Sequence, residues 1–210
     1  MSKALCCYAF ETLVNKLKID TNKVLLTAYF DDLKQDPSTL PSSAPLFITW
    51  NKHSSLRGCI GTFQSLPIES GVSKFSLSAA LQDPRFPPIT LKEVKDLEVS
   101  VTLLDKFVSI DNAEDWTIGL NGLKISLDIE HQHFLGTFLP SVAEDEEWDK
   151  LTTLYYLLKK ADYPVAKSKV TDFYSKGLKE GWLKLTRYDG LKAHLDYDEF
   201  VQIRNEIVES

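Results

Sequence analysis

The chain of 210 residues has only three cysteines and four histidines, the residue types that build disulfides and many metal centres, and it lacks long apolar runs. Its three cysteines, Cys6, Cys7 and Cys59, are odd in number and show no metal-ligand spacing, which predicts free thiols in a reducing compartment. No apolar run approaches the roughly 18 residues of a membrane span, and the N-terminus lacks the basic and apolar regions of a signal peptide. We therefore expect a cytoplasmic protein without a membrane partner, small enough to enter the nucleus as well.

Positive charge is also scarce, with 24 lysines and arginines against 30 aspartates and glutamates and a formal net charge of -6. Nucleic-acid binding depends on cationic contacts with phosphates, so this balance argues against a nucleic-acid partner. The sequence contains no phosphate-binding loop, dinucleotide fingerprint or zinc cluster, and we expect no cofactor. His131 and His133 share one face of a strand, but a metal site needs more ligands, so no metal is predicted.

The hydrophobic pattern predicts an α+β fold with a mostly antiparallel sheet and flanking helices. Alternation predicts strands over 46–50, 57–63, 98–104, 123–129, 134–138, 182–188 and 191–195, the last two as a hairpin turning at Asp189-Gly190. Helical spacing predicts helices over 4–18, 23–30, 67–82 and 146–160, with another near the C-terminus after an Asp196 cap. Hairpins outnumber βαβ alternations, which favours antiparallel pairing. We expect one domain over 1–210, with a seam between two lobes near 105–117.

One run, 56–62, places a cation, a thiol and two glycines inside a predicted strand. Glycine weakens a strand interior, so glycines there usually mark a bulge or a close approach to the backbone. On a regular strand Arg57, Cys59 and Gly61 share one face, and Gly58 lies on the other. These residue types suit a small polar pocket.

Cys59 is the candidate nucleophile of this run, because thiolates are activated by a neighbouring cation or a histidine base. Arg57 would supply the cation and His53, in the preceding turn, the base. The alternative is a buried cysteine packed as a small hydrophobic side chain beside a structural arginine. Arg57 would bind a carboxylate or phosphate through its planar fork, or else form an ion pair within the protein, with Asp83 as the expected partner.

The proline-rich loop 83–88 is the second candidate element. Its three prolines reduce the entropy lost when the loop becomes ordered. Such a loop either positions a site or makes a plain turn. In the first case Asp83 and Arg85 would close over a ligand bound at Gly58 and Gly61. The candidate ligand-binding residues are therefore Arg57, Gly58, Cys59, Gly61, Asp83 and Arg85.

Together these motifs resemble the AMMECR domain family. The resemblance is carried by Leu56–Thr62, Asp83–Pro88, Glu98–Val101, Gly136–Pro140 and Glu147–Asp149, in that order. It covers nearly the whole chain, and the Leu-Arg-Gly-Cys-Ile-Gly run is identified as the family's signature. It implies one α+β unit with a larger and a smaller lobe in a soluble intracellular protein, and it leaves the activity open. Where relatives often carry an Arg-Gly pair, this chain has Leu135-Gly136.

Two classes of function remain. The first is a binding or adaptor domain that acts on a protein partner or a small anionic ligand through the 56–61 run and the 83–88 loop. The second is an enzyme acting on a small anionic substrate, with Cys59 as nucleophile and Arg57 stabilising the anion, aided by His53 or Asp83. The lack of a complete catalytic set favours the binding domain. Sequence-tolerant nucleic-acid binding is a weaker third hypothesis.

Overall fold

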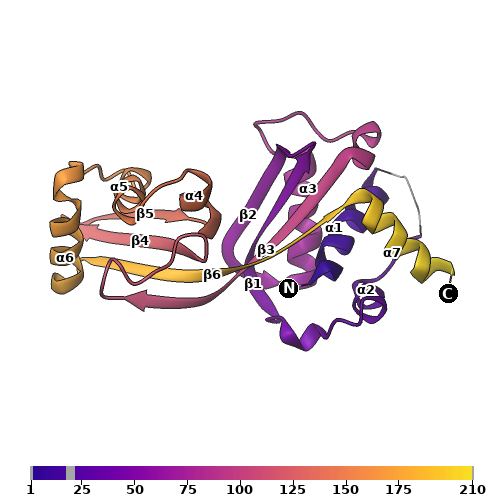
Figure 1. The fold of residues 1–210 in the computed structure, drawn as a ribbon, viewed down its shortest axis with the longest axis horizontal. Coiled ribbons are helices and arrows are strands. Elements are labelled where there is room, and N and C mark those ends of the chain that lie inside the picture. The colour runs from indigo at the N-terminus through magenta and orange to yellow at the C-terminus, as the bar shows by residue number, and fades with distance from the viewer. Residues whose placement is uncertain (1, 18–21, 210) are drawn as a thin grey trace. The chain divides into compact units, whose positions relative to one another are not determined.

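The computed structural model describes residues 2–17 and 22–209, and it mixes helices with an antiparallel sheet (Figure 1). The α+β prediction is therefore confirmed. The chain divides into a first unit, residues 1–103 with 191–210, and a second unit, residues 104–190. The strands follow the order β2-β1-β3-β6-β4-β5. No helix in the described part of the chain is long and apolar enough to cross a membrane.

The first unit contains helices on both sides of its strands in the sequence, starting with α1. They are α1 (Lys3–Lys16), α2 (Leu26–Asp32), β1 (Ser43–Lys52), β2 (Ser55–Pro67), α3 (Ile68–Leu81), the short 3-10 helices η1 (Pro37–Thr39) and η2 (Leu91–Asp96), and α7 (Tyr197–Glu209). The strand β3 (Leu97–Ile110) begins in this unit and β6 (Leu183–Asp196) ends in it. Of the predicted helix 4–18, Lys18 lies outside the described residues.

The central strand β1 pairs antiparallel with both β2 and β3. Its alternate residues Leu46, Ile48 and Trp50 are completely buried, as the period of two in a strand requires. Helix α3 packs on β1 and β2, and α1 packs on α3. These contacts build the core of the first unit under the β1–β2 hairpin.

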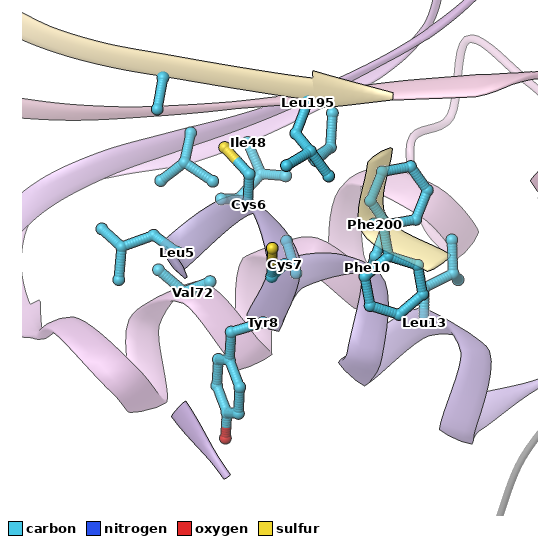
Figure 2. Close-up of a cluster of buried hydrophobic side chains, with 14 of the residues drawn as sticks. Leu5, Cys6, Cys7, Tyr8, Phe10, Leu13, Ile48, Val72, Leu195 and Phe200 are labelled. Atoms are coloured by element: carbon cyan, nitrogen blue, oxygen red, sulfur yellow. The ribbon is translucent and has the colours of Figure 1, made fainter. Parts of the chain in front are cut away.

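Cys6 and Cys7 lie in this core, on α1 among apolar side chains (Figure 2). Close by, the ring of Phe10 meets the ring of Trp50 edge-on at 5.0 Å and stacks on that of Phe200 at 5.1 Å. Burial raises the pKa of the Cys6 thiol to about 12 and that of Cys7 further still. Both cysteines therefore act as small hydrophobic side chains.

The second unit packs helices on a short antiparallel sheet. Its elements are β4 (Asn121–Ile129), β5 (Gln132–Phe138), α4 (Pro140–Asp145), α5 (Lys150–Lys160), the 3-10 helix η3 (Lys167–Lys169) and α6 (Val170–Glu180). Leu123, Ile125 and Leu127 alternate into its core. Gly136 lies under α5, where an added Cβ would be 2.9 Å from the carbonyl oxygen of Leu157.

The predicted hairpin with a turn at Asp189-Gly190 is wrong, because β6 is one continuous strand. The usual two-residue hairpin turns, types I′ and II′, need a positive φ at the first central residue or at both. Neither Asp189 nor Gly190 has a positive φ. Asp189 instead pairs with Asn121 of β4 and accepts a hydrogen bond from its side-chain amide at 2.9 Å. Pairing with β4, which is distant in the sequence, therefore keeps Asp189 and Gly190 in a strand although the two residues favour a turn locally.

Candidate functional site

The β1–β2 hairpin positions the 56–62 run. Its loop is His53-Ser54, and both residues have positive φ, 49° and 63°, as a type I′ turn requires. Trp50 pairs with Gly58 while the next residue of β1 pairs with Leu56, so Arg57 is the extra residue of a β-bulge. The bulge changes the direction of the Arg57 side chain from the one that it would have in a regular strand.

The two glycines of the run are sites of close approach within the protein itself. A Cβ on Gly58 would lie 2.0 Å from the carbonyl oxygen of Ala79 in α3. A Cβ on Gly61 would lie 2.3 Å from the carbonyl oxygen of Leu46 and 2.4 Å from the ring of Phe47. The protein's own atoms therefore occupy the space that a larger side chain would need.

Arg57 is held by Glu93 of η2 rather than by Asp83, so the expected Asp83 pairing is wrong. Its Nε donates to Glu93 Oε1 at 3.1 Å and its Nη2 donates to Oε2 at 3.2 Å. Its Nη1 donates to the carbonyl oxygen of Pro87 at 2.7 Å, and Nη2 reaches that of Pro88 at 3.3 Å. With only 12% of its side chain exposed, Arg57 fastens the 83–88 loop to β2.

Glu93 is the centre of this fastening. Its carboxylate accepts from Arg57, from Lys52 Nζ at 3.3 Å, and from the backbone N–H and the hydroxyl of Thr90, each at 3.0 Å. The hydrogen bond from Arg57 is the main reason that the pKa of Glu93 falls to about 2. Thr90 and Glu93 form a capping box at the start of η2, and one carboxylate serves both the cap and the arginine.

Cys59 is held at its backbone by the 83–88 loop. Its N–H donates to Asp83 Oδ2 at 2.9 Å, and its carbonyl oxygen accepts from Arg85 Nη2 at 3.0 Å. Because β2 is an edge strand, these two groups point away from β1 and would otherwise be open to another chain. We call Asp83 and Arg85 the edge cap, since the pair replaces a neighbouring strand for one residue.

Within the edge cap a buried carboxylate anchors a partly exposed guanidinium. Asp83 is 5% exposed and accepts from Arg85 Nε at 2.9 Å and from Nη2 at 2.6 Å. These bonds, with that from the Cys59 N–H, hold the pKa of Asp83 well below its usual value. The ring of Phe86 packs against the guanidinium at 5.4 Å. The Arg85 side chain is 54% exposed, and its Nη1 has no hydrogen-bond partner among the described residues.

The Cys59 thiol is half-buried and accepts a hydrogen bond from Thr49 Oγ1 at 3.2 Å. β1 continues three residues from Thr49 to Lys52, about 10 Å at 3.3 Å per residue, and His53 follows in the hairpin loop. The structure thus brings together Cys59, Asp83 and Arg85 and places His53 at the far end of the hairpin.

The sequence did not reveal the hydrogen bond from Thr49 to the Cys59 thiol or the pairing of Glu93 with Arg57. The Thr90–Glu93 spacing marks a helix cap, but nothing local links it to an arginine 36 residues away. Elsewhere, His133 Nδ1 lies 2.6 Å from Asp128 Oδ1, and no group of three potential metal ligands occurs in the ranges 2–17 and 22–209.

Residues 6–178 match the model of the AMMECR1 family. An uncharacterised protein of Schizosaccharomyces pombe is 32% identical over 203 residues, which cover 95% of each chain. An uncharacterised protein of Saccharomyces cerevisiae is 37% identical over 180 residues, 74% of this chain and 69% of the other. The crystal structure of an uncharacterised protein from Pyrococcus horikoshii superposes with a TM-score of 0.67 at 24% identity, covering 92% and 90% of the two chains, and shows the same fold.

Proposed function

The chain belongs to the AMMECR1 family, and we propose that it is a binding module that receives the carboxylate or phosphate group of a ligand at Arg85. The observation that carries this proposal is the edge cap. Asp83 is buried and accepts hydrogen bonds from Nε and Nη2 of Arg85, and Nη2 also donates to the Cys59 carbonyl oxygen. The remaining nitrogen, Nη1, has no partner among the described residues and belongs to a side chain that is 54% exposed. The ligand is an anionic group of a protein partner or a small anionic molecule.

Preorganisation is the physical reason for choosing Arg85. An arginine that is already ordered loses less side-chain entropy when it binds, and the two N–H groups of its Nη1 are left to donate to carboxylate or phosphate oxygens. Asp83 neutralises part of the charge, so recognition depends on hydrogen-bond geometry at Nη1 more than on long-range attraction. Arg57 is less suited to this role, because its Nε and both terminal nitrogens already donate to Glu93, Pro87 and Pro88.

Catalysis with Cys59 as nucleophile is the second candidate function. It is favoured by the partial exposure of this thiol, whereas Cys6 and Cys7 are buried. In that case Arg85, whose Nη2 reaches the Cys59 carbonyl, would take the anion-stabilising role first given to Arg57. The Cys59→Ser variant separates the two functions, because a binding module keeps its anion affinity and an enzyme loses turnover.

A nuclear magnetic resonance titration with inorganic phosphate and with acetate at constant ionic strength tests the proposal. We expect saturable shifts at the Cys59 amide and the Arg85 side chain, weaker binding for Arg85→Lys and none for Arg85→Gln. Arg187→Gln is the matched control, because Arg187 also donates to an aspartate, Asp115, at 2.6 Å but lies in the second unit. Equal shifts in the wild type and Arg85→Gln would refute an anion site at Arg85.

A further inference from the structure

The second unit contains a hollow of about 410 Å³ that the proposed function does not use. Three aromatic rings line it, those of Tyr163, Phe173 and Trp182, together with two carboxylates, Asp128 and Glu130. Its volume lies within the roughly 300–1,000 Å³ typical of small-ligand sites. Aromatic faces with carboxylates nearby are the chemistry that proteins use to hold organic cations.

The three rings form a connected, non-parallel set. Phe173 lies in α6, and its ring meets that of Trp182 at 5.0 Å and 68° and that of Tyr163 at 5.5 Å and 32°. The indole Nε1 of Trp182 donates to Glu180 Oε2 at 2.8 Å. Gly177 lets α6 approach this indole, since an added Cβ would lie 2.8 Å from two ring carbons. The rings are therefore positioned by packing before any ligand arrives.

The backbone of the two acidic residues is fixed by the end of β4 and its turn into β5. The N–H of Asp128 donates to the carbonyl oxygen of Trp182 at 2.8 Å, which ties the end of β4 to the aromatic set. Glu130 lies in a two-residue turn with φ of 50°, followed by His131 with φ of 64°. Lys176 also lines the hollow, and His133 Nδ1 lies 2.6 Å from Asp128 Oδ1. With a neutral His133, the two carboxylates and one ammonium of the lining leave one net negative charge.

We infer that this hollow binds an alkylated ammonium group, such as the trimethylammonium of a small molecule or of a methylated lysine side chain. A methylated ammonium is weakly hydrated, so aromatic faces replace its water, and the negative rim adds attraction. An unmodified lysine ammonium is strongly hydrated and gains less from the rings. The same rings and carboxylates disfavour an anionic ligand, which distinguishes this site from Arg85.

Titration of the full chain with choline, with N-acetyl-trimethyllysine amide and with its unmethylated lysine counterpart tests the inference. We expect the Trp182 indole Nε1–H resonance to shift saturably with both trimethylammonium probes and much less with the lysine probe. Tighter binding of the trimethyllysine probe would assign a protein side chain as the ligand, and tighter binding of choline would assign a small molecule. Equal binding of all three probes, or no shift with any, would overturn the inference.

Variants locate the site. Phe173→Leu should weaken choline binding by about tenfold, consistent with the loss of one cation–π contact at a partly desolvated site. Because this variant also alters packing, Glu130→Gln provides an exposed change at the rim, with an expected loss of about threefold. Glu146→Gln, an exposed glutamate of the same unit, is the control and should bind as the wild type does. Wild-type affinity in both Phe173→Leu and Glu130→Gln would place the cation elsewhere.

Discussion

Asp83 Oδ2 accepts the backbone N–H of Cys59 at 2.9 Å, so a carboxylate from the proline-rich loop satisfies an outward-facing group of the edge strand β2. The same carboxylate accepts two hydrogen bonds from Arg85. One buried side chain thus joins a strand edge, a loop and an exposed cation, and its replacement should affect all three.

Replacement of Asp83 should separate these contributions. Asp83→Ala leaves the Cys59 N–H without its acceptor and should lower the free energy of unfolding by about 1–3 kcal/mol. Asp83→Asn keeps an acceptor oxygen but loses the charge that pairs with Arg85, so its cost should be smaller. Urea denaturation measures both. A cost below experimental error for Asp83→Ala would mean that water replaces the edge cap.

Acid should weaken the contacts of Arg57 with Glu93, which help to hold the 83–88 loop on β2, within a defined pH range. The pKa of Glu93 is about 2 in the folded protein against a usual 4.5, so the unfolded chain takes up the proton first. The stabilisation is therefore complete above pH 4.5 and is lost as the pH falls toward about 2. Asp83 contributes in the same direction, from its usual 3.8 downward.

The measurement for this window is the free energy of unfolding as a function of pH. Glu93→Gln should be less stable than the wild type at neutral pH and should show a shallower decline below pH 4.5. An identical slope in the two proteins would assign the acid sensitivity to other carboxylates.

The buried carboxylate of Glu11 should contribute far more to stability than an exposed ion pair. Glu11 is fully buried and accepts from Arg204 Nε at 2.8 Å, from the Tyr29 hydroxyl at 2.8 Å and from the Val24 N–H at 2.9 Å. Removing one partner of a buried pair costs about 3–5 kcal/mol, so Arg204→Met should unfold at markedly lower urea.

The Lys3–Glu199 pair in the same unit provides the comparison. Both of its side chains are more than a third exposed, and exposed pairs contribute on the order of 1 kcal/mol or less. A Lys3→Met variant as unstable as Arg204→Met would contradict this ranking.

The three thiols should differ in their reaction with iodoacetamide. In the native protein we expect only Cys59 to be alkylated, because Cys6 and Cys7 are completely buried and burial raises their pKa values. Peptide mass spectrometry after native labelling and after labelling in urea distinguishes the sites. Modification of Cys6 at the rate of Cys59 under native conditions would show that α1 opens readily.

Short-range patterns predicted the elements that local physics controls. The alternation of Leu123, Ile125 and Leu127 identifies β4 because each side chain faces the core by strand periodicity alone. The Thr90–Glu93 box identifies η2 because both caps act within one turn. Helix α6 was missed although Val170, Phe173, Tyr174 and Leu178 recur at helical spacing. Gly177 disfavours a helix interior by propensity, and only the structure shows that it allows α6 to pack closely on Trp182 and Leu183.

The sequence by itself therefore determined the α+β class and the hairpin that carries Cys59. Only the tertiary structure decided that Arg57 pairs with Glu93, that Asp83 and Arg85 cap Cys59, and that β6 runs through Asp189. The physical reason is the range of the interaction. Caps and alternation involve neighbours in the chain, whereas each of these contacts joins segments more than twenty residues apart, whose meeting depends on how the whole chain packs.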